Sequence, residues 1–243
     1  NKMLTITNDK KRLHLNRKNS TKLKLLGIQS SPFIWMNLYG KGKAKEQVLI
    51  DTGMAGFYDM SNKDFKIFHD KDIIQFIDSS KGSHVGGLFG SENKTEQYRS
   101  LIPKMEIAKS TFTNFVTTTT HDKFSKIGTD ILDYGNMTID YKNERFYFDP
   151  FKKEIDLKKK ELGFDPAFVN DKIVVGFVWD ENLKKIISYG DEIIEVNHII
   201  IQDSDLCDLA IKKNIFMNSD KFNLRIKKYN GEIIELDLEK KYF

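Results

Sequence analysis

The chain has 243 residues, of which 40% are hydrophobic and 30% are charged. This length gives room for about two domains, and the composition allows a buried core and excludes an intrinsically disordered chain. The formal net charge is only +4, and the lysines are scattered along the sequence. Nucleic-acid-binding surfaces concentrate their positive charge, so we expect no nucleic acid as partner.

Targeting and redox signals are few. No apolar run approaches the ~20 residues of a membrane-spanning helix, so we expect no transmembrane segment in this chain. Cys207 is the single cysteine, so no disulfide can form within the chain. The cysteine content therefore does not distinguish an oxidising from a reducing compartment. The sequence begins at Asn1 rather than at a methionine, and we interpret it as a trimmed or processed segment.

Residues 1–32 are basic and contain short alternating patterns, which predict half-buried strands. The apolar positions are Leu4, Ile6, Leu13, Leu15, Leu23 and Leu25. The stretch Leu4–Leu15 also aligns without gaps to Met137–Phe148, with three identities in twelve positions. This internal repeat predicts that residues 1–32 are the tail of a preceding lobe, most of which is missing from this chain.

Residues 33–150 predict a small, mostly β domain, because short strand-like runs alternate with turns. The expected strands are 33–39, 47–50, 101–107, 111–119, 137–139 and 145–148, with further strands flanking a Gly-rich segment at 82–90. Ser61 has the position of an N-cap for a short helix that ends near Phe68. The charged residues 151–161 are interpreted as a linker or a solvated helix.

Residues 162–243 predict a separate α+β module. Residues 173–179 are a strand, and residues 204–213 have helical spacing after an N-cap at Ser204. Two alternating runs flank Asn230-Gly231, the strongest hairpin signal in the chain.

The motif with chemical content is residues 48–53, where Val-Leu-Ile runs into Asp51, Thr52 and Gly53. A strand that delivers a carboxylate to a tight glycine turn can present it to a substrate. The Gly-rich segment follows about thirty residues later, and Lys126-Ile127-Gly128 provides a second apolar-glycine signature. The alternative is an ordinary aspartate in a glycine turn, with the tripeptide occurring by accident.

These motifs resemble those of the retropepsin-like aspartic peptidases, especially the bacterial ones with an attached PDZ-like domain. The resemblance implies a retropepsin-like or pepsin-like β-barrel lobe at 33–150 and a PDZ-like domain at 162–243. It implies that Asp51 is catalytic, that Thr52 hydrogen-bonds to the other half-site, and that Gly53 lets the loop approach its twin. Gly128 would support the loop, and 82–90 would be the flap. The expected flap and substrate-binding residues are His84, Val85, Gly86, Gly87 and Leu88.

Catalysis in this family needs two close carboxylates that share one proton, so that one activates a water and the other polarises the scissile carbonyl. The chain has one such motif, and the second carboxylate would come from a homodimer partner or from the missing N-terminal lobe. Met54 stands where the family usually has Ala or Ser. The predicted activity is an aspartic endopeptidase that uses no metal or cofactor. The alternative is a non-catalytic peptide-binding or assembly protein with a degenerate protease fold.

In the second domain, the resemblance implies that backbone amides near Leu162, Gly163 and Phe164 bind a peptide carboxylate. The peptide would then add as a strand beside this segment and against the helix at 204–213. The other interpretation is a PDZ fold used only for packing or assembly. The family also implies the bacterial cell envelope, periplasmic or secreted, although the sequence leaves the cytoplasm open.

Overall fold

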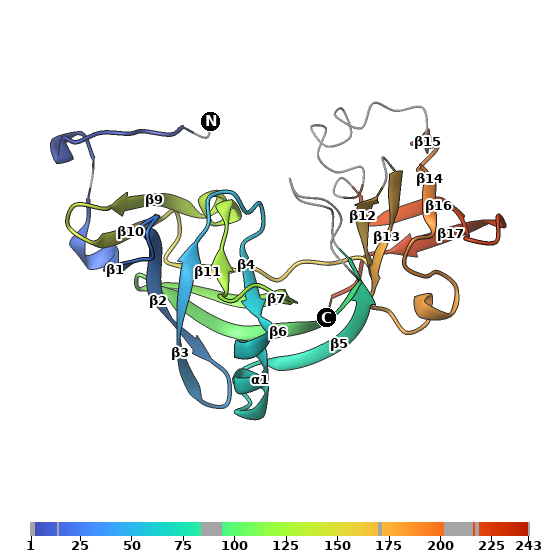
Figure 1. Cartoon of the computed structure of the whole chain (residues 1–243), viewed down its shortest axis with the longest axis horizontal. Coiled ribbons are helices and arrows are strands. Elements are labelled where there is room, and N and C mark those ends of the chain that lie inside the picture. The colour runs from blue at the N-terminus through green and yellow to red at the C-terminus, as the bar shows by residue number, and fades with distance from the viewer. Residues whose placement is uncertain are drawn as a thin grey trace. The chain divides into compact units, whose positions relative to one another are not determined.

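The computed structural model describes residues 3–13, 15–83, 94–169, 172–201, 216 and 219–242. Strands predominate and helices are short, which confirms the mostly β fold class (Figure 1). The chain divides into two compact units. Unit 1 consists of Asn1–Gln75 and Leu101–Leu157, and unit 2 of Phe76–Ser100 and Lys158–Phe243. Residues 76–100, expected in the first domain, therefore group with the second.

Unit 1 is built from one sheet with the strand order β6-β7-β4-β8-β3-β2-β1-β10-β9, and β11 pairs with β7. Its strands are β1 (Ser20–Leu26), β2 (Ser31–Tyr39), β3 (Lys43–Ile50), β4 (Tyr58–Ser61), β6 (Thr95–Ile107), β7 (Ser110–Thr120), β8 (Lys126–Ile127), β9 (Gly135–Asp140), β10 (Arg145–Pro150) and β11 (Glu154–Asp156). Its helical elements are α1 (Asn62–Asp70) and the 3₁₀ turns η1 (Lys10–Arg12), η2 (Arg17–Asn19) and η3 (Thr129–Asp133).

Six of these strands form a closed barrel, in the order β6-β7-β4-β8-β3-β2. β6 pairs with β7 on one side and with β2 on the other, where Leu38 lies opposite Met105. Alternate residues of each strand point inward, so Met36 and Leu38 of β2 and Val48 of β3 are fully buried. The barrel thus leaves no open edge between β2 and β6 and provides a rigid frame for the loop after β3.

The short strand β8 lies between β3 and β4. It runs parallel to β3, with Ile127 opposite Ile50, and antiparallel to β4, with Ile127 opposite Tyr58. Two strands that follow each other in sequence are thereby separated by a third from further along the chain. The connection from β3 to β4, residues 51–57, must pass around the end of β8.

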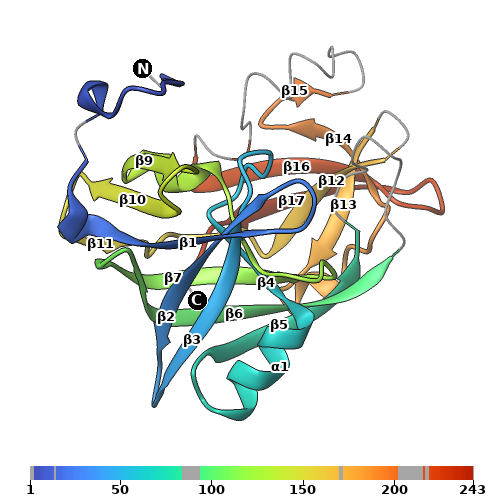
Figure 2. The ribbon, with the colours of Figure 1, turned by 60° about the vertical axis from the view of Figure 1, so that its left-hand side comes forward.

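Strands β1, β10 and β9 extend the sheet beyond β2, as Figure 2 shows. The hairpin expected at 137–148 is confirmed, with Arg145 opposite Asp140. The strands expected at residues 4–6 and 13–15 are wrong for the described residues: Leu4 and Ile6 are exposed and outside any strand, and η1 follows. Asp9 accepts a hydrogen bond from the Lys11 backbone N–H, which favours a local turn over strand pairing.

The predicted helix after Ser61 is confirmed as α1. The Asp64 backbone N–H donates to Ser61 Oγ at 3.1 Å, which is the expected cap. Phe65 and Phe68 are buried one turn apart on the face toward the barrel.

Unit 2 contains a second sheet, of order β12-β13-β14-β16-β17, with β15 on β14. Its elements are β12 (Phe164–Val169), β13 (Lys172–Val178), η4 (Leu183–Lys185), β14 (Glu192–Val196), β15 (Ile199–Ile200), β16 (Lys221–Lys227) and β17 (Ile233–Glu239), together with β5 (Gln75–Gly82) and the first residues of β6. The Asn230-Gly231 hairpin is confirmed between β16 and β17, and Gly231 has a φ of +87°. The expected helix at 204–213, with Cys207, lies outside the described residues.

Candidate active site around Asp51

Asp51 follows β3 directly, in a turn that fixes its carboxylate. Its backbone N–H donates to the Ile127 carbonyl at 2.9 Å, and its carbonyl accepts from the Met54 N–H at 3.2 Å. The Gly53 N–H donates to Asp51 Oδ1 at 3.0 Å. The carboxylate is therefore oriented by its own loop, while its side chain stays about 30% exposed.

The segment directly after β8, Gly128 and Thr129, is hydrogen-bonded to this loop. The Gly128 N–H donates to the Phe57 carbonyl at 3.1 Å, and the Thr129 N–H and hydroxyl both donate to the Met54 carbonyl, at 2.8 and 3.0 Å. A Cβ at Gly128 would lie 2.2 Å from the Gly56 carbonyl oxygen. Only glycine allows this approach of the two backbones, so the structure places Gly128 against the loop that carries Asp51.

Met54 packs on the loop itself. Its Cε lies 3.1 Å from the Cβ position of Gly56, and its Cγ lies 3.0 Å from that of Gly128. The thioether thus covers the two close glycines, a role that suits its flexible side chain.

Lys126 contacts Asp51, an interaction that sequence reasoning missed. Its Nζ lies 3.3 Å from Asp51 Oδ2 and 2.6 Å from Asp122 Oδ2. Burial lowers the pKa of Lys126, but the two carboxylates outweigh it and the pKa is raised overall. The ammonium therefore stays charged beside Asp51.

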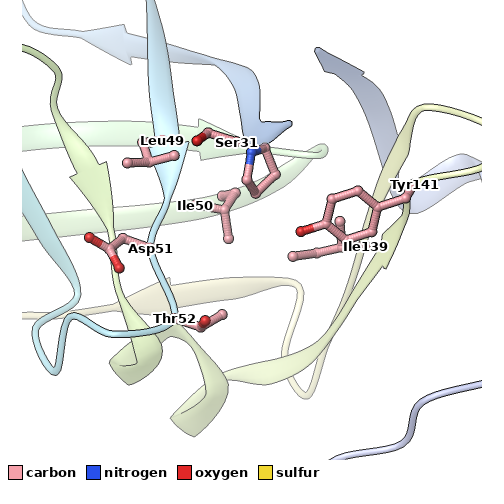
Figure 3. A pocket seen from close by; sticks show the side chains of 8 residues that line it. Ser31, Leu49, Ile50, Asp51, Thr52, Ile139 and Tyr141 are labelled. Carbon is pink, nitrogen blue, oxygen red and sulfur yellow. The ribbon is translucent and has the colours of Figure 1, made fainter. Parts of the chain in front are cut away.

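A pocket of about 230 Å³ opens next to Asp51. Its lining residues are Ser31, Pro32, Leu49, Ile50, Asp51, Thr52, Ile139 and Tyr141. Figure 3 shows Asp51 and Thr52 on one side, with Ile139 and Tyr141 facing them from the other. Sites for drug-sized ligands enclose ~300–1,000 Å³, so this pocket has the size for one or two side chains.

A buried polar group lies on β3, five residues before Asp51. Glu46 on β3 accepts a hydrogen bond from the Tyr58 hydroxyl at 2.7 Å. Burial raises the pKa of Glu46 to about 8, against opposing hydrogen bonds from Ser125 and Tyr58. Glu46 is therefore protonated at neutral pH. Sequence reasoning gave it no role, because a glutamate on a strand is usually solvent-exposed.

In unit 2, the segment Leu162–Phe164 is packed rather than open. Leu162 and Phe164 are buried, and the Gly163 carbonyl accepts from the N–H groups of Trp179 and Asp180 at 2.8 and 3.0 Å. A Cβ at Gly163 would lie 2.7 Å from Asp180 Cβ. The glycine is thus required by a close approach within unit 2.

A buried arginine, Arg99, lies beside this segment. Its guanidinium donates to Asp165 Oδ1 at 3.0 Å, lies 3.6 Å from Glu161 Oε2 and stacks 4.5 Å from the Trp179 ring. The Trp179 indole N–H donates to Asp165 Oδ2 at 2.7 Å. No spacing rule links residue 99 to residue 165, so this group could not be found from the sequence.

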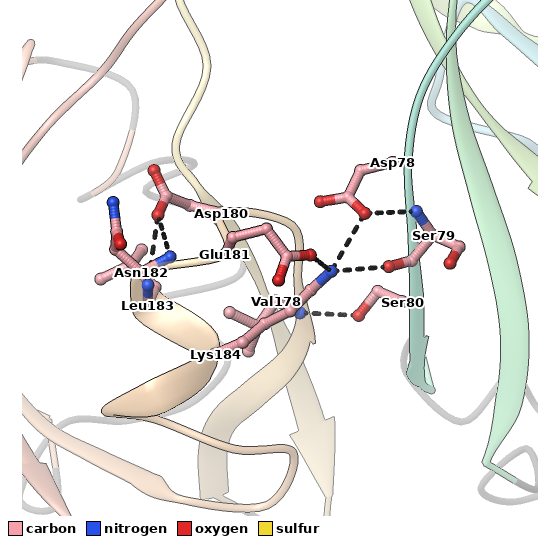
Figure 4. Close-up of polar contacts among 9 residues, drawn as sticks. All are labelled: Asp78, Ser79, Ser80, Val178, Asp180, Glu181, Asn182, Leu183 and Lys184. Carbon is pink, nitrogen blue, oxygen red and sulfur yellow. Dashed lines mark hydrogen bonds and ion pairs between the residues drawn. The ribbon is translucent and has the colours of Figure 1, made fainter.

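The strand that leads toward the predicted flap belongs to the same unit. Lys184 Nζ donates to Asp78 Oδ1 at 3.0 Å and to the Ser79 carbonyl at 2.9 Å, and the Val178 N–H donates to Ser80 Oγ at 3.0 Å (Figure 4). The strand is therefore fixed by polar contacts within unit 2. The expected flap residues lie outside the described residues: His84, Val85, Gly86, Gly87 and Leu88.

Comparison with known proteins gave no relatives, since neither a scan against family models nor a search of curated proteins found a match. Within the described residues, no three His, Cys, Asp or Glu side chains are grouped so that they could hold a metal ion. No helix in the same part of the chain has the length and apolarity to cross a membrane.

Proposed function

We propose that the chain is one half of an aspartic endopeptidase, with Asp51 as one of a pair of carboxylates. The observation that supports this best is the position of β8 between β3 and β4, with Gly128 against the loop. This arrangement carries a partly exposed carboxylate on a closed barrel and orients it with the Gly53 N–H. Such preorganisation is what general acid–base catalysis requires.

The reaction would be hydrolysis of a peptide bond by water. The pair holds one proton between its two carboxyl groups, because two adjacent carboxylates cannot both ionise easily. The ionised member removes a proton from water, and the resulting hydroxide attacks the scissile carbonyl carbon. The protonated member donates to the carbonyl oxygen, which gives a tetrahedral diol. The C–N bond then breaks as the amine accepts the proton that the first carboxylate took from water, and a diol hydroxyl returns a proton to the second carboxylate. The pair titrates as a unit, so we assign neither role to Asp51 alone.

The second carboxylate would come from a homodimer partner or from a preceding lobe. β9 ends the strand order of unit 1, so its outer edge presents backbone groups that a further strand could pair with. Ile139 on β9 also lines the pocket beside Asp51. A partner at this edge would therefore bring its own residues close to the site.

The test is cleavage of a peptide library between pH 3 and pH 8 by the wild type and by Asp51→Asn. The substitution keeps the size of the side chain and its contact with Gly53 while removing the base. We expect the rate to fall by roughly a hundredfold or more. Asp70→Asn, at the exposed end of α1, is the matched control and should retain the wild-type rate. Cleavage that persists in Asp51→Asn would refute the proposed mechanism.

A second candidate function is peptide binding or assembly without catalysis. The ion pair between Lys126 and Asp51 favours it, because the ammonium occupies an oxygen of Asp51 that catalysis would use. β12 also ends the strand order of unit 2, and an edge strand can accept a peptide as an added strand. A wild-type protein that binds peptides and cleaves none at any pH would establish this alternative.

A further inference from the structure

We propose that Lys126 is a positioning residue that inhibits the site through its ion pair with Asp51. The site becomes active when the Lys126 ammonium leaves Asp51 and pairs with Asp122 alone. This inference rests on the proposed peptidase function. It adds a regulatory contact that resides within unit 1.

The register of β8 explains why Lys126 meets Asp51. Ile127 is fully buried in the barrel, so the side chain of the preceding residue must point to the opposite face. Lys126 lies opposite Leu49 on β3 and opposite Asp59 on β4. Since Leu49 is two residues before Asp51, the long side chain of Lys126 reaches the carboxylate at the end of the strand.

Both oxygens of Asp51 are then occupied. Oδ1 accepts from the Gly53 N–H at 3.0 Å, and Oδ2 lies 3.3 Å from Lys126 Nζ. Each oxygen of Asp51 therefore already has a donor, which a catalytic water or the partner carboxyl group would have to displace. The Lys126–Asp51 ion pair thus opposes the arrangement from which catalysis starts.

Asp122 gives Lys126 a second position. It lies four residues before Lys126, its Oδ2 is 2.6 Å from Nζ, and its side chain is more exposed than that of Asp51, at 53% against 30%. A lysine that leaves Asp51 therefore keeps an ionic partner and need not be left unpaired. The charged groups around Lys126 are Asp51 directly after β3, Asp59 on β4 and Asp122 in the turn before β8.

The ion pair itself is tested without reference to activity, by NMR titration of the Lys126 ammonium in the full chain. The two carboxylates raise the pKa of Lys126 against burial. We expect Asp51→Asn and Asp122→Asn each to lower it relative to the wild type. Identical Lys126 titrations in wild type and Asp51→Asn would overturn the proposal.

The inhibitory effect is tested by peptide cleavage. We expect Lys126→Met to cleave about tenfold faster than wild type at pH 6–7, whereas Lys126→Arg retains the charge and should show no such gain. Lys123→Met, which removes a neighbouring exposed lysine, is the matched control. Asp122→Asn should have the opposite effect and cleave several-fold more slowly, because Lys126 loses its second position. This exposed substitution keeps the test decisive if Lys126→Met fails to fold.

Two failures can be told apart. An active wild type with equal or slower cleavage in Lys126→Met refutes the inhibitory role. An ion pair confirmed by NMR, with no cleavage by any variant, refutes the peptidase function while the Lys126–Asp51 contact stands.

Discussion

Glu46 provides the sharpest test of the barrel core. Its carboxyl group is buried on β3 and accepts a hydrogen bond from Tyr58. We expect Glu46→Gln to remove most of the pH dependence of unit 1 stability between pH 5 and pH 8. Glutamine has nearly the same shape, still accepts from the Tyr58 hydroxyl and cannot ionise. The substitution thus removes the ionisation of residue 46 while leaving the packing of its side chain nearly unchanged.

The magnitude follows from the pKa of Glu46, which burial raises from an ordinary 4.5 to about 8. Between these values the native state keeps a proton that the unfolded chain has lost, so the free energy of unfolding falls as pH rises. The stabilisation is complete below pH 4.5 and is lost as pH rises through about 8. Each pH unit corresponds to about 1.4 kcal/mol, which gives an upper limit of about 5 kcal/mol over the window.

The measurement is native-state amide hydrogen exchange of β3 and β4 in urea, at pH 5 to 9, with exchange rates corrected for intrinsic pH dependence. This readout follows unit 1 alone. The wild type should lose protection as pH rises, whereas Glu46→Gln should remain nearly constant. Glu106→Gln removes the carboxylate of a second Tyr–Glu hydrogen bond, to Tyr39, that is only part-buried, and is the matched control. Parallel pH curves for wild type and Glu46→Gln would refute a buried, protonated Glu46.

The remaining predictions concern the two glycine segments. Gly128→Ala should destabilise unit 1 by about 1–3 kcal/mol in thermal unfolding, because a Cβ would lie 2.2 Å from the Gly56 carbonyl oxygen. Gly42→Ala, whose Cβ would lie 3.4 Å from the Ile73 side chain, is the control and should have little effect. If Leu162–Phe164 binds a peptide carboxylate, peptides with a free C-terminus should bind more tightly than their amidated forms in calorimetry. Equal affinities would remove that assignment.

The strands of the barrel were accessible from the sequence because alternation reports which face is buried. Residues 33–39, 47–50 and 111–119 were predicted as strands, and β2, β3 and β7 cover them. The order of strands was not predictable, since β8 is two residues long and is recognised only by its partners. The same limit applies to residues 76–83 and 94–100, whose contacts with the rest of unit 2 join residues more than sixty positions apart.

The incorrect prediction of strands within residues 4–15 shows where the alternation of apolar and polar residues fails as a predictor. Leu4 and Ile6 have the same spacing as Met137 and Ile139, yet only the second pair lies in a hairpin. A strand needs a partner, and β9 has β10 as its partner. Alternation specifies a face that could be buried, but the partner decides whether a strand forms.

The Asp51 motif shows a similar division between what the residues specify and what their neighbours decide. The sequence located the carboxylate and the glycine that supports its loop. It gave Lys126 no role, although alternation along β8 requires the residue before a buried Ile127 to face the opposite side. Because β8 is parallel to β3, that side is the one on which Asp51 emerges. The long side chain of Lys126 therefore reaches the carboxylate of Asp51 and places a positive charge beside it. The charge next to Asp51 thus depends on residue 126 as well as on the Asp-Thr-Gly sequence itself.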